Sequence, residues 1–171
     1  MKVFISYHRK DTKYKNRIIE ILQENNIKYY CVPDDQDFDG WSHEKIAEFI
    51  RSKLNECNII LCVVGCDTYS RPHVDIEIHY ALKGELGARK GIVAVMLENR
   101  QDSKNDIDLE TFPAKLSQNK EYIVLEQFAS LENRLVSALN KAKKNSANPN
   151  LQTNHSNKVM KLRSGKYYDM N

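Results

Sequence analysis

A chain of 171 residues is long enough for one domain with a proper hydrophobic core and a tail. Its 26 basic and 23 acidic side chains leave a net charge of +3, which argues neither for nor against a nucleic-acid or membrane partner, and we predict neither. The opening residues MKVFISYH hold too short an apolar run for a signal peptide, and no segment approaches the length of a membrane helix. We therefore expect a cytoplasmic protein.

The four cysteines favour neither a disulfide framework nor a metal site. Cys31, Cys57, Cys62 and Cys66 contain no Cys-x-x-Cys pair, and two of them fall within predicted strands. Buried, reduced thiols of a cytosolic protein are the better interpretation. The five histidines also lack the spacing of metal ligands, so we predict no metal.

Apolar runs alternate with helical patterns along most of the chain. The predicted strands are residues 2–6, 27–31, 58–65, 91–97 and 122–125. Amphipathic helices are predicted over about residues 12–25, 42–54, 70–82 and 131–139, with an irregular excursion over 98–117. Five strands alternating with helices predict an α/β fold, a parallel doubly wound sheet with helices on both faces. Its expected strand order is the flavodoxin-like 2-1-3-4-5.

The character of the sequence changes after residue 142. Residues 1–142 are predicted to form the domain, and residues 143–171 a polar, flexible C-terminal extension. Lys143–Asn157 (KKNSANPNLQTNHSN) is rich in Asn and Ser, which favours flexibility. Lys158–Tyr168 is compatible with a small hairpin, a docked arm or disorder.

The stretch Cys66–Leu82 directly follows the most apolar run, Asn58–Gly65. Ser70 is predicted to be a helix N-cap, with Pro72 in the first turn. Glu77 sits one position off the apolar stripe of this helix, half-sheltered above the end of a central strand. It is the best candidate for chemistry, although a solvated helix glutamate is the alternative from spacing alone.

The predicted strand order places a crevice between the first and third strands, where the turns Tyr7–Asp11 and Cys66–His73 meet. The acidic loop Pro33–Trp41 lies next to them. Cations neutralise phosphates, aromatic faces stack on bases, and a carboxylate can hold a ribose hydroxyl and stabilise an oxocarbenium-like transition state. The groups gathered in this cleft therefore favour a phosphate-bearing, ring-containing ligand; they are Glu77, His8, Arg9, Arg71, His73, Tyr7, Trp41 and Tyr69.

Several nucleotide-binding classes are disfavoured. The chain has no G-x-G-x-x-G and no G-x-x-x-x-G-K-[ST], and only six glycines in all. The loop YHRKD is not the Ser/Thr/Gly-rich phosphate loop that a flavin would need. A phosphoacceptor receiver domain would need an acidic pair in the turn after the first strand, where this chain has Arg9 and Lys10.

Three segments resemble TIR domains. VFISYHRKD resembles their opening strand and loop, the Asp-Gly-Trp loop sits where they carry the BB loop, and GCDTYSRPHVDIEIHYAL resembles their Ser-x-x-Trp-[Cys/Val]-x-x-Glu helix start. The match covers about Lys2–Leu97 and, more loosely, the final helix. Within the superfamily the chain looks most like the stand-alone TIR-like proteins of the bacterial Thoeris anti-phage system. The pattern of these proteins after the third strand corresponds here to Gly65, Thr68, Tyr69, Arg71, Val74, Glu77 and Ile78.

The resemblance implies an NAD+ glycohydrolase or ADP-ribosyl cyclase that cleaves the nicotinamide–ribose bond, with NAD+ as substrate and no cofactor. The product would be a cyclic or conjugated ADP-ribose messenger for a separate effector protein, and homo-oligomers are compatible with the resemblance. Glu77 falls on the family's catalytic glutamate. The expected substrate contacts are Phe4, Ser6, His8 and Arg9 on one wall, Asp67 and Tyr69 on the other, and Trp41 above. Tyr7 and His73 are expected to contact the substrate as well.

Two features depart from the family pattern. His73 stands where an aromatic residue is common, four positions before Glu77, and the acidic loop lacks the usual proline–glycine tip. Two alternatives stay open. One is a non-catalytic TIR-type interaction module, in which Glu77 is only a surface charge. The other is a nucleoside deoxyribosyltransferase-like enzyme, which shares the sheet and uses a glutamate nucleophile.

Overall fold

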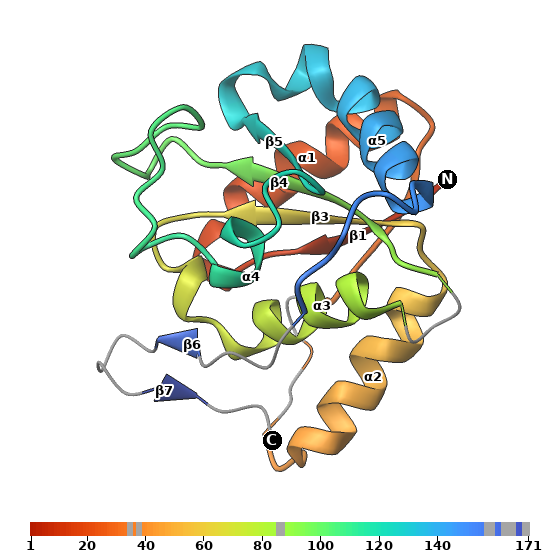
Figure 1. The fold of residues 1–171 in the computed structure, drawn as a ribbon, viewed down its shortest axis with the longest axis vertical. Helices are drawn as coiled ribbons and strands as arrows, with labels where there is room; N and C mark the ends of the chain where they lie inside the picture. Colours follow the sequence, from red (N-terminus) through yellow and green to blue (C-terminus); the bar gives the residue numbers. More distant parts are fainter. Residues whose placement is uncertain (34–35, 37–38, 85–87, 156–159, 162–166, 169–171) are drawn as a thin grey trace.

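The computed structural model describes residues 1–33, 36, 39–84, 88–155, 160–161 and 167–168. Five strands form its main sheet: β1 (Lys2–Ser6), β2 (Lys28–Cys31), β3 (Ile59–Val64), β4 (Gly91–Met96) and β5 (Val124–Gln127). All neighbours pair in parallel in the order β2-β1-β3-β4-β5 (Figure 1). The predicted flavodoxin-like topology is confirmed.

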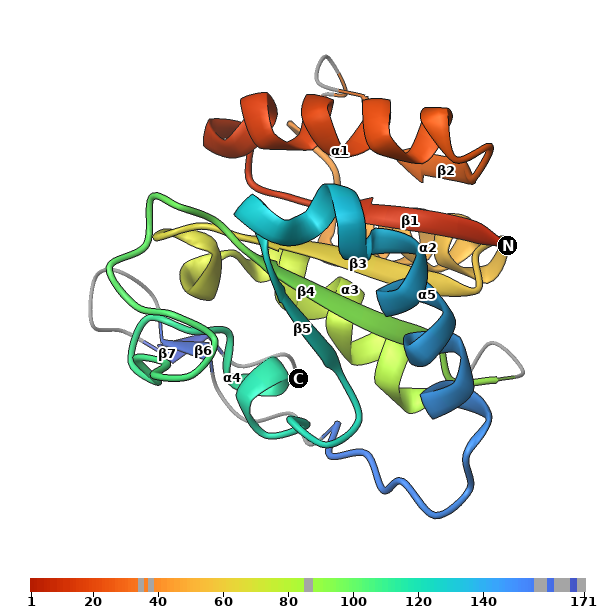
Figure 2. The ribbon, with the colours of Figure 1, turned by 90° about the horizontal axis from the view of Figure 1, so that it is seen from above.

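Helices cover both faces of this sheet. On one face lie α1 (Thr12–Glu24) and α5 (Leu131–Ala147), and on the other lie α2 (His43–Asn55), α3 (Pro72–Lys83) and the short α4 (Ala114–Ser117) (Figures 1 and 2). The side chains of β3 and β4 alternate between two hydrophobic clusters, one on each face. Every residue of these two strands is buried, which explains why their sequences are continuously apolar. No helix in the described part of the chain is long and apolar enough to cross a bilayer.

The helix starts were predicted with mixed success. Ser42 caps α2 as expected, its hydroxyl accepting a hydrogen bond from the Lys45 N–H at 3.2 Å. Ser70 does not cap α3, so that prediction is wrong. It lies in the 3-10 turn η2 (Thr68–Ser70), where its hydroxyl donates to the Asp67 carbonyl at 3.0 Å. The helix begins one residue later than expected, with Arg71 at the N-cap and Pro72 in the first turn.

The cysteines differ in exposure. Cys57 and Cys62 are buried as expected, whereas Cys31 is partly buried and Cys66 is exposed. Burial in the core raises the pKa of the Cys57 thiol to about 11, so it is an unreactive thiol at neutral pH.

The chain after α5 packs against the domain. Helix α5 continues to Ala147, so the first residues of the segment expected to be flexible are helical. Arg89 then donates hydrogen bonds to the Leu151 carbonyl and, at 2.8 Å, to the Asn148 carbonyl. The Thr153 hydroxyl donates to the carbonyl of Leu82, the last leucine of α3, at 3.3 Å. Residues 148–155 therefore form a strap across α3.

A two-stranded hairpin follows the strap. β6 (Met160–Lys161) pairs antiparallel with β7 (Tyr167–Tyr168), which was one of the alternatives for this segment. β6 also contacts η2, so the hairpin lies beside the turn that follows β3 (Figure 1).

Candidate active site

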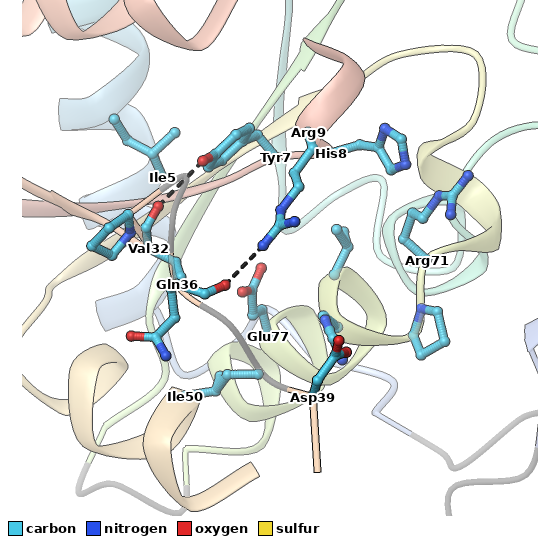
Figure 3. A pocket seen from close by; sticks show the side chains of 14 residues that line it. Ile5, Tyr7, His8, Arg9, Val32, Gln36, Asp39, Ile50, Arg71 and Glu77 are labelled. Atoms are coloured by element: carbon cyan, nitrogen blue, oxygen red, sulfur yellow. Dashed lines mark hydrogen bonds between the residues drawn. The ribbon is translucent and has the colours of Figure 1, made fainter. Parts of the chain in front are cut away.

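A pocket of about 500 Å³ opens at the carboxyl ends of β1, β2 and β3 (Figure 3). Three stretches form its walls: the turn after β1, the loop after β2, and the start of α3. The pocket lies at the switch point between β1 and β3, where the doubly wound topology predicts a ligand. Its lining consists of Ile5, Tyr7, His8, Arg9, Val32, Pro33, Gln36, Asp39, Ile50, Arg71, Pro72, His73, Val74 and Glu77.

Glu77 projects from α3 into this pocket (Figure 3). It is only 6% exposed, so it is more deeply buried than the half-sheltered position expected from helix spacing. Its Oε2 is buried and has no hydrogen-bond partner among the described residues. Burial raises the pKa of the carboxyl to about 8, and the nearby Ser6 hydroxyl opposes part of that rise. A buried carboxyl without a partner costs free energy in the folded protein, which makes it a strong functional candidate.

Two buried side chains of neighbouring strands, Ser6 of β1 and Cys62 of β3, lie near the Glu77 carboxyl. Ser6 ends β1 at 1% exposure, and its Oγ meets no partner in full hydrogen-bond geometry within the described residues. It still lies close enough to lower the pKa of the Glu77 carboxyl. Cys62 of β3 is also adjacent, and the charge of Glu77 adds to the burial that raises the pKa of this thiol. Ser6 is therefore placed to influence the ionisation of Glu77.

Polar contacts join the turn after β1 to the loop after β2. The Tyr7 hydroxyl donates to the Val32 carbonyl at 3.2 Å, and the Arg9 guanidinium donates to the Gln36 carbonyl at 2.8 Å (Figure 3). These contacts hold the two walls at a defined separation. Residues 34–35 and 37–38 of the predicted acidic loop lie outside the described residues.

The structure brings together five of the predicted site residues on the pocket lining. Glu77 and His73 come from α3, and Tyr7, His8 and Arg9 from the turn after β1. This grouping follows from the strand order, because the carboxyl ends of parallel strands meet at one edge of the sheet.

Five predicted substrate contacts lie outside that lining. Ser6 is buried at the end of β1. Phe4 is fully buried in the core, Trp41 packs edge-on against Phe49 at 5.9 Å between ring centroids, and Asp67 and Tyr69 lie beside and within η2. Their contact with a substrate stays a prediction.

Sequence reasoning missed part of the lining. Gln36 and Asp39 belong to the predicted acidic loop but were not predicted individually as site residues, and Ile50 was predicted to be an ordinary core residue of its helix. The acidic loop was expected beside the cleft, but no local pattern indicates which of its residues face the pocket.

The doubly wound sheet and the carboxyl at its switch point define a flavodoxin-like α/β domain with a candidate active site. A family profile described as "Thoeris protein ThsB, TIR-like domain" matches residues 4–102, more than half of the chain, including Glu77. The chain therefore belongs to the TIR-like domain family of Thoeris ThsB proteins.

Solved structures of two proteins with TIR domains align with this chain. The TIR domain of the Toll-related receptor TRR-2 from Hydra magnipapillata aligns with a TM-score of 0.51 and 15% identity, over 85% of this chain and 98% of that one. The TIR domains of the activated Roq1 resistosome, which recognises the effector XopQ, align with a TM-score of 0.44 and 16% identity, over 84% and 80%. The Hydra likeness supports the fold alone. No curated protein matches the chain.

Proposed function

We propose that this protein cleaves the nicotinamide–ribose bond of NAD+ and releases a cyclic or conjugated ADP-ribose signal that acts on a separate effector protein in anti-phage defence. The observation that carries the proposal is the buried Glu77 carboxyl, which lacks a hydrogen-bond partner for Oε2 and lines a pocket large enough for a nucleotide. Membership of the Thoeris TIR-like family supports it.

Glu77 acts by stabilising positive charge. The nicotinamide ribose lies against the carboxylate, which accepts hydrogen bonds from its hydroxyls. With a pKa of about 8, the carboxyl is mostly protonated before the substrate arrives. The positive charge of the pyridinium ring favours the ionised form, so binding of NAD+ releases a proton. The ionised carboxylate then faces the anomeric carbon as positive charge develops there.

The reaction needs no external redox partner. The bond between C1′ and the ring nitrogen breaks, and its electron pair passes to the ring, so nicotinamide leaves as a neutral molecule. A hydroxyl of the same molecule attacks C1′ and loses its proton, which gives a cyclic ADP-ribose, nicotinamide and one proton. Attack by a hydroxyl of another molecule gives a conjugate instead.

The direct test is nicotinamide release from NAD+ by the purified full chain. We expect release by the wild-type protein and by Glu48→Gln, a matched control at an exposed position of α2. Glu77→Gln should lose about 10²- to 10³-fold in rate, the usual effect of removing one preorganised electrostatic group. Release by Glu77→Gln at the wild-type rate would reject the assignment.

The same samples separate the two alternatives. A deoxyribosyltransferase-like enzyme exchanges the base of free nucleosides and leaves NAD+ intact. A non-catalytic assembly module consumes neither substrate, and its self-association should be the same in Glu77→Gln and in the wild type.

A further inference from the structure

Arg71 precedes α3 and lies at the rim of the pocket, on the same side as His8 (Figure 3). Its Nε is buried without a hydrogen-bond partner, and the guanidinium forms no ion pair within the described residues. The neighbouring cations are engaged: Arg9 donates to the Gln36 carbonyl, and Lys10 pairs with Asp67 at 3.2 Å. A buried donor left unpaired is costly in the folded protein, so Arg71 is a group that a ligand would complete.

The N-terminal turn of α3 is a second positive feature at the same rim. The helix has 12 residues, begins with Pro72, and no side chain caps it. His73 and Val74 of this first turn line the pocket beside Arg71. The exposed N–H groups and the dipole of a helix N-terminus favour an anion. The guanidinium and the helix end therefore point to the same kind of ligand.

The spacing between Arg71 and Glu77 restricts the kinds of ligand that can contact both residues. Glu77 lies six residues after Arg71, which is roughly 9 Å along the helix axis. The pocket thus presents positive charge at its rim and a carboxyl one and a half turns further along the same helix. Asp39, from the loop after β2, adds one carboxylate to the same lining. A ribose that lies at Glu77 and carries a 5′-diphosphate can span from one feature to the other.

We infer that Arg71 and the N-terminal turn of α3 form a subsite for the diphosphate of a nucleotide whose ribose lies at Glu77. The placement of the ribose rests on the proposed function, whereas the anion subsite rests on Arg71 and the helix end alone. Arg71 is a binding and positioning residue: it selects phosphorylated nucleotides over free nucleosides and aligns the ribose with Glu77.

Calorimetric titration with inorganic pyrophosphate and with ADP-ribose tests the subsite. Both probes should bind the wild-type chain, and Arg71→Gln should bind them about 10- to 100-fold more weakly, the usual effect of losing a charged hydrogen bond. Arg17→Gln, the same change on α1 at the other face of the sheet, should bind like the wild type. Arg71→Lys keeps the positive charge but lacks the planar guanidinium, so its affinity for both probes should fall severalfold. This variant still tests the subsite if Arg71→Gln does not fold. Equal binding by Arg71→Gln, or no saturable binding by the wild type, would overturn the subsite.

Nicotinamide release separates this inference from the proposed function. If release depends on Glu77 but Arg71→Gln keeps the wild-type KM for NAD+, the subsite is wrong and the function stands. If pyrophosphate binding depends on Arg71 but the wild type releases no nicotinamide, the subsite stands and the function is wrong. The joint proposal predicts a KM raised about 10-fold or more in Arg71→Gln, with a smaller change in kcat.

Discussion

Two buried carboxyls stand two residues apart on α3 and have opposite surroundings. Asp75 and Glu77 are 5% and 6% exposed, and burial raises the pKa of both groups. Asp75 points to α4, where it forms an ion pair with the buried ammonium of Lys115. Glu77 faces the pocket, and its Oε2 has no partner among the described residues. The two carboxyls are equally buried, but Asp75 holds α3 to α4 whereas Glu77 is open to a ligand.

The largest expected effect is on the free energy of unfolding and comes from breaking the ion pair of Asp75. Asp75→Asn leaves the Lys115 charge buried without its partner, and we expect it to lower the free energy of unfolding by about 3–5 kcal/mol. Urea denaturation at pH 7 measures this loss. The double variant Asp75→Leu with Lys115→Met, which removes both charges, should recover most of the stability. A loss below about 1 kcal/mol in Asp75→Asn would show that the pair does not hold α3 to α4.

Glu77→Gln should have the opposite effect on stability, and the effect should depend on pH. The pKa of Glu77 is about 8 in the folded protein, above its ordinary value of 4.5, so the folded state binds the proton more tightly than the unfolded state. This contribution to stability is full below pH 4.5 and is lost as the pH rises through 8. The glutamine variant has no proton to lose. We expect it to match the wild type near pH 4, to exceed it by roughly 3 kcal/mol at pH 7, and to exceed it by more at pH 9.

Thermal unfolding of both proteins from pH 4 to pH 9 measures this difference. Glu48→Gln, on the exposed side of α2, should show no such trend. A constant difference between Glu77→Gln and the wild type across this range would contradict the buried state of the carboxyl.

The smallest effect concerns Ser6. Its hydroxyl lowers the pKa of Glu77, so Ser6→Ala should raise that pKa further and move the rising limb of the pH–rate profile of nicotinamide release to higher pH. We expect a shift below about one pH unit and a severalfold loss of kcat/KM at pH 7. Ser52→Ala, on an exposed turn of α2, is the matched control. An unchanged profile in Ser6→Ala would mean that this hydroxyl does not act on Glu77.

Much of the fold could be predicted because its signals are local. The sequences of β3 and β4 are continuously apolar since both strands are buried on both faces, and their alternation with helices restricts the strand order. That order alone places Glu77 beside the turn after β1. The position of the candidate site was therefore accessible from the sequence.

What could not be predicted depends on contacts between distant parts of the chain. Glu77 was expected to be half-sheltered, but Ser6 of β1 and Cys62 of β3 lie near its carboxyl. The strap of residues 148–155 looked flexible because it is rich in Asn and Ser, yet it packs against α3. The ring of His155 in the strap lies 6.1 Å from that of His79 on α3. The local pattern also gives no sign that Asp75 is paired, because its partner Lys115 lies forty positions further along the chain.

The pKa of Glu77 in the folded protein is the most direct test of the candidate active site. Carbon-13 NMR of the glutamate side-chain carboxyls, with the Glu77 signal assigned by its absence in Glu77→Gln, follows this one group through a pH titration. We expect a midpoint near pH 8 in the protein without ligand, far above the ordinary value of 4.5 for a glutamate carboxyl. Addition of ADP-ribose, which carries no pyridinium charge, should leave that midpoint well above the ordinary value. A midpoint near 4.5 without ligand would contradict the account, because Glu77 would then be an ordinary solvated glutamate.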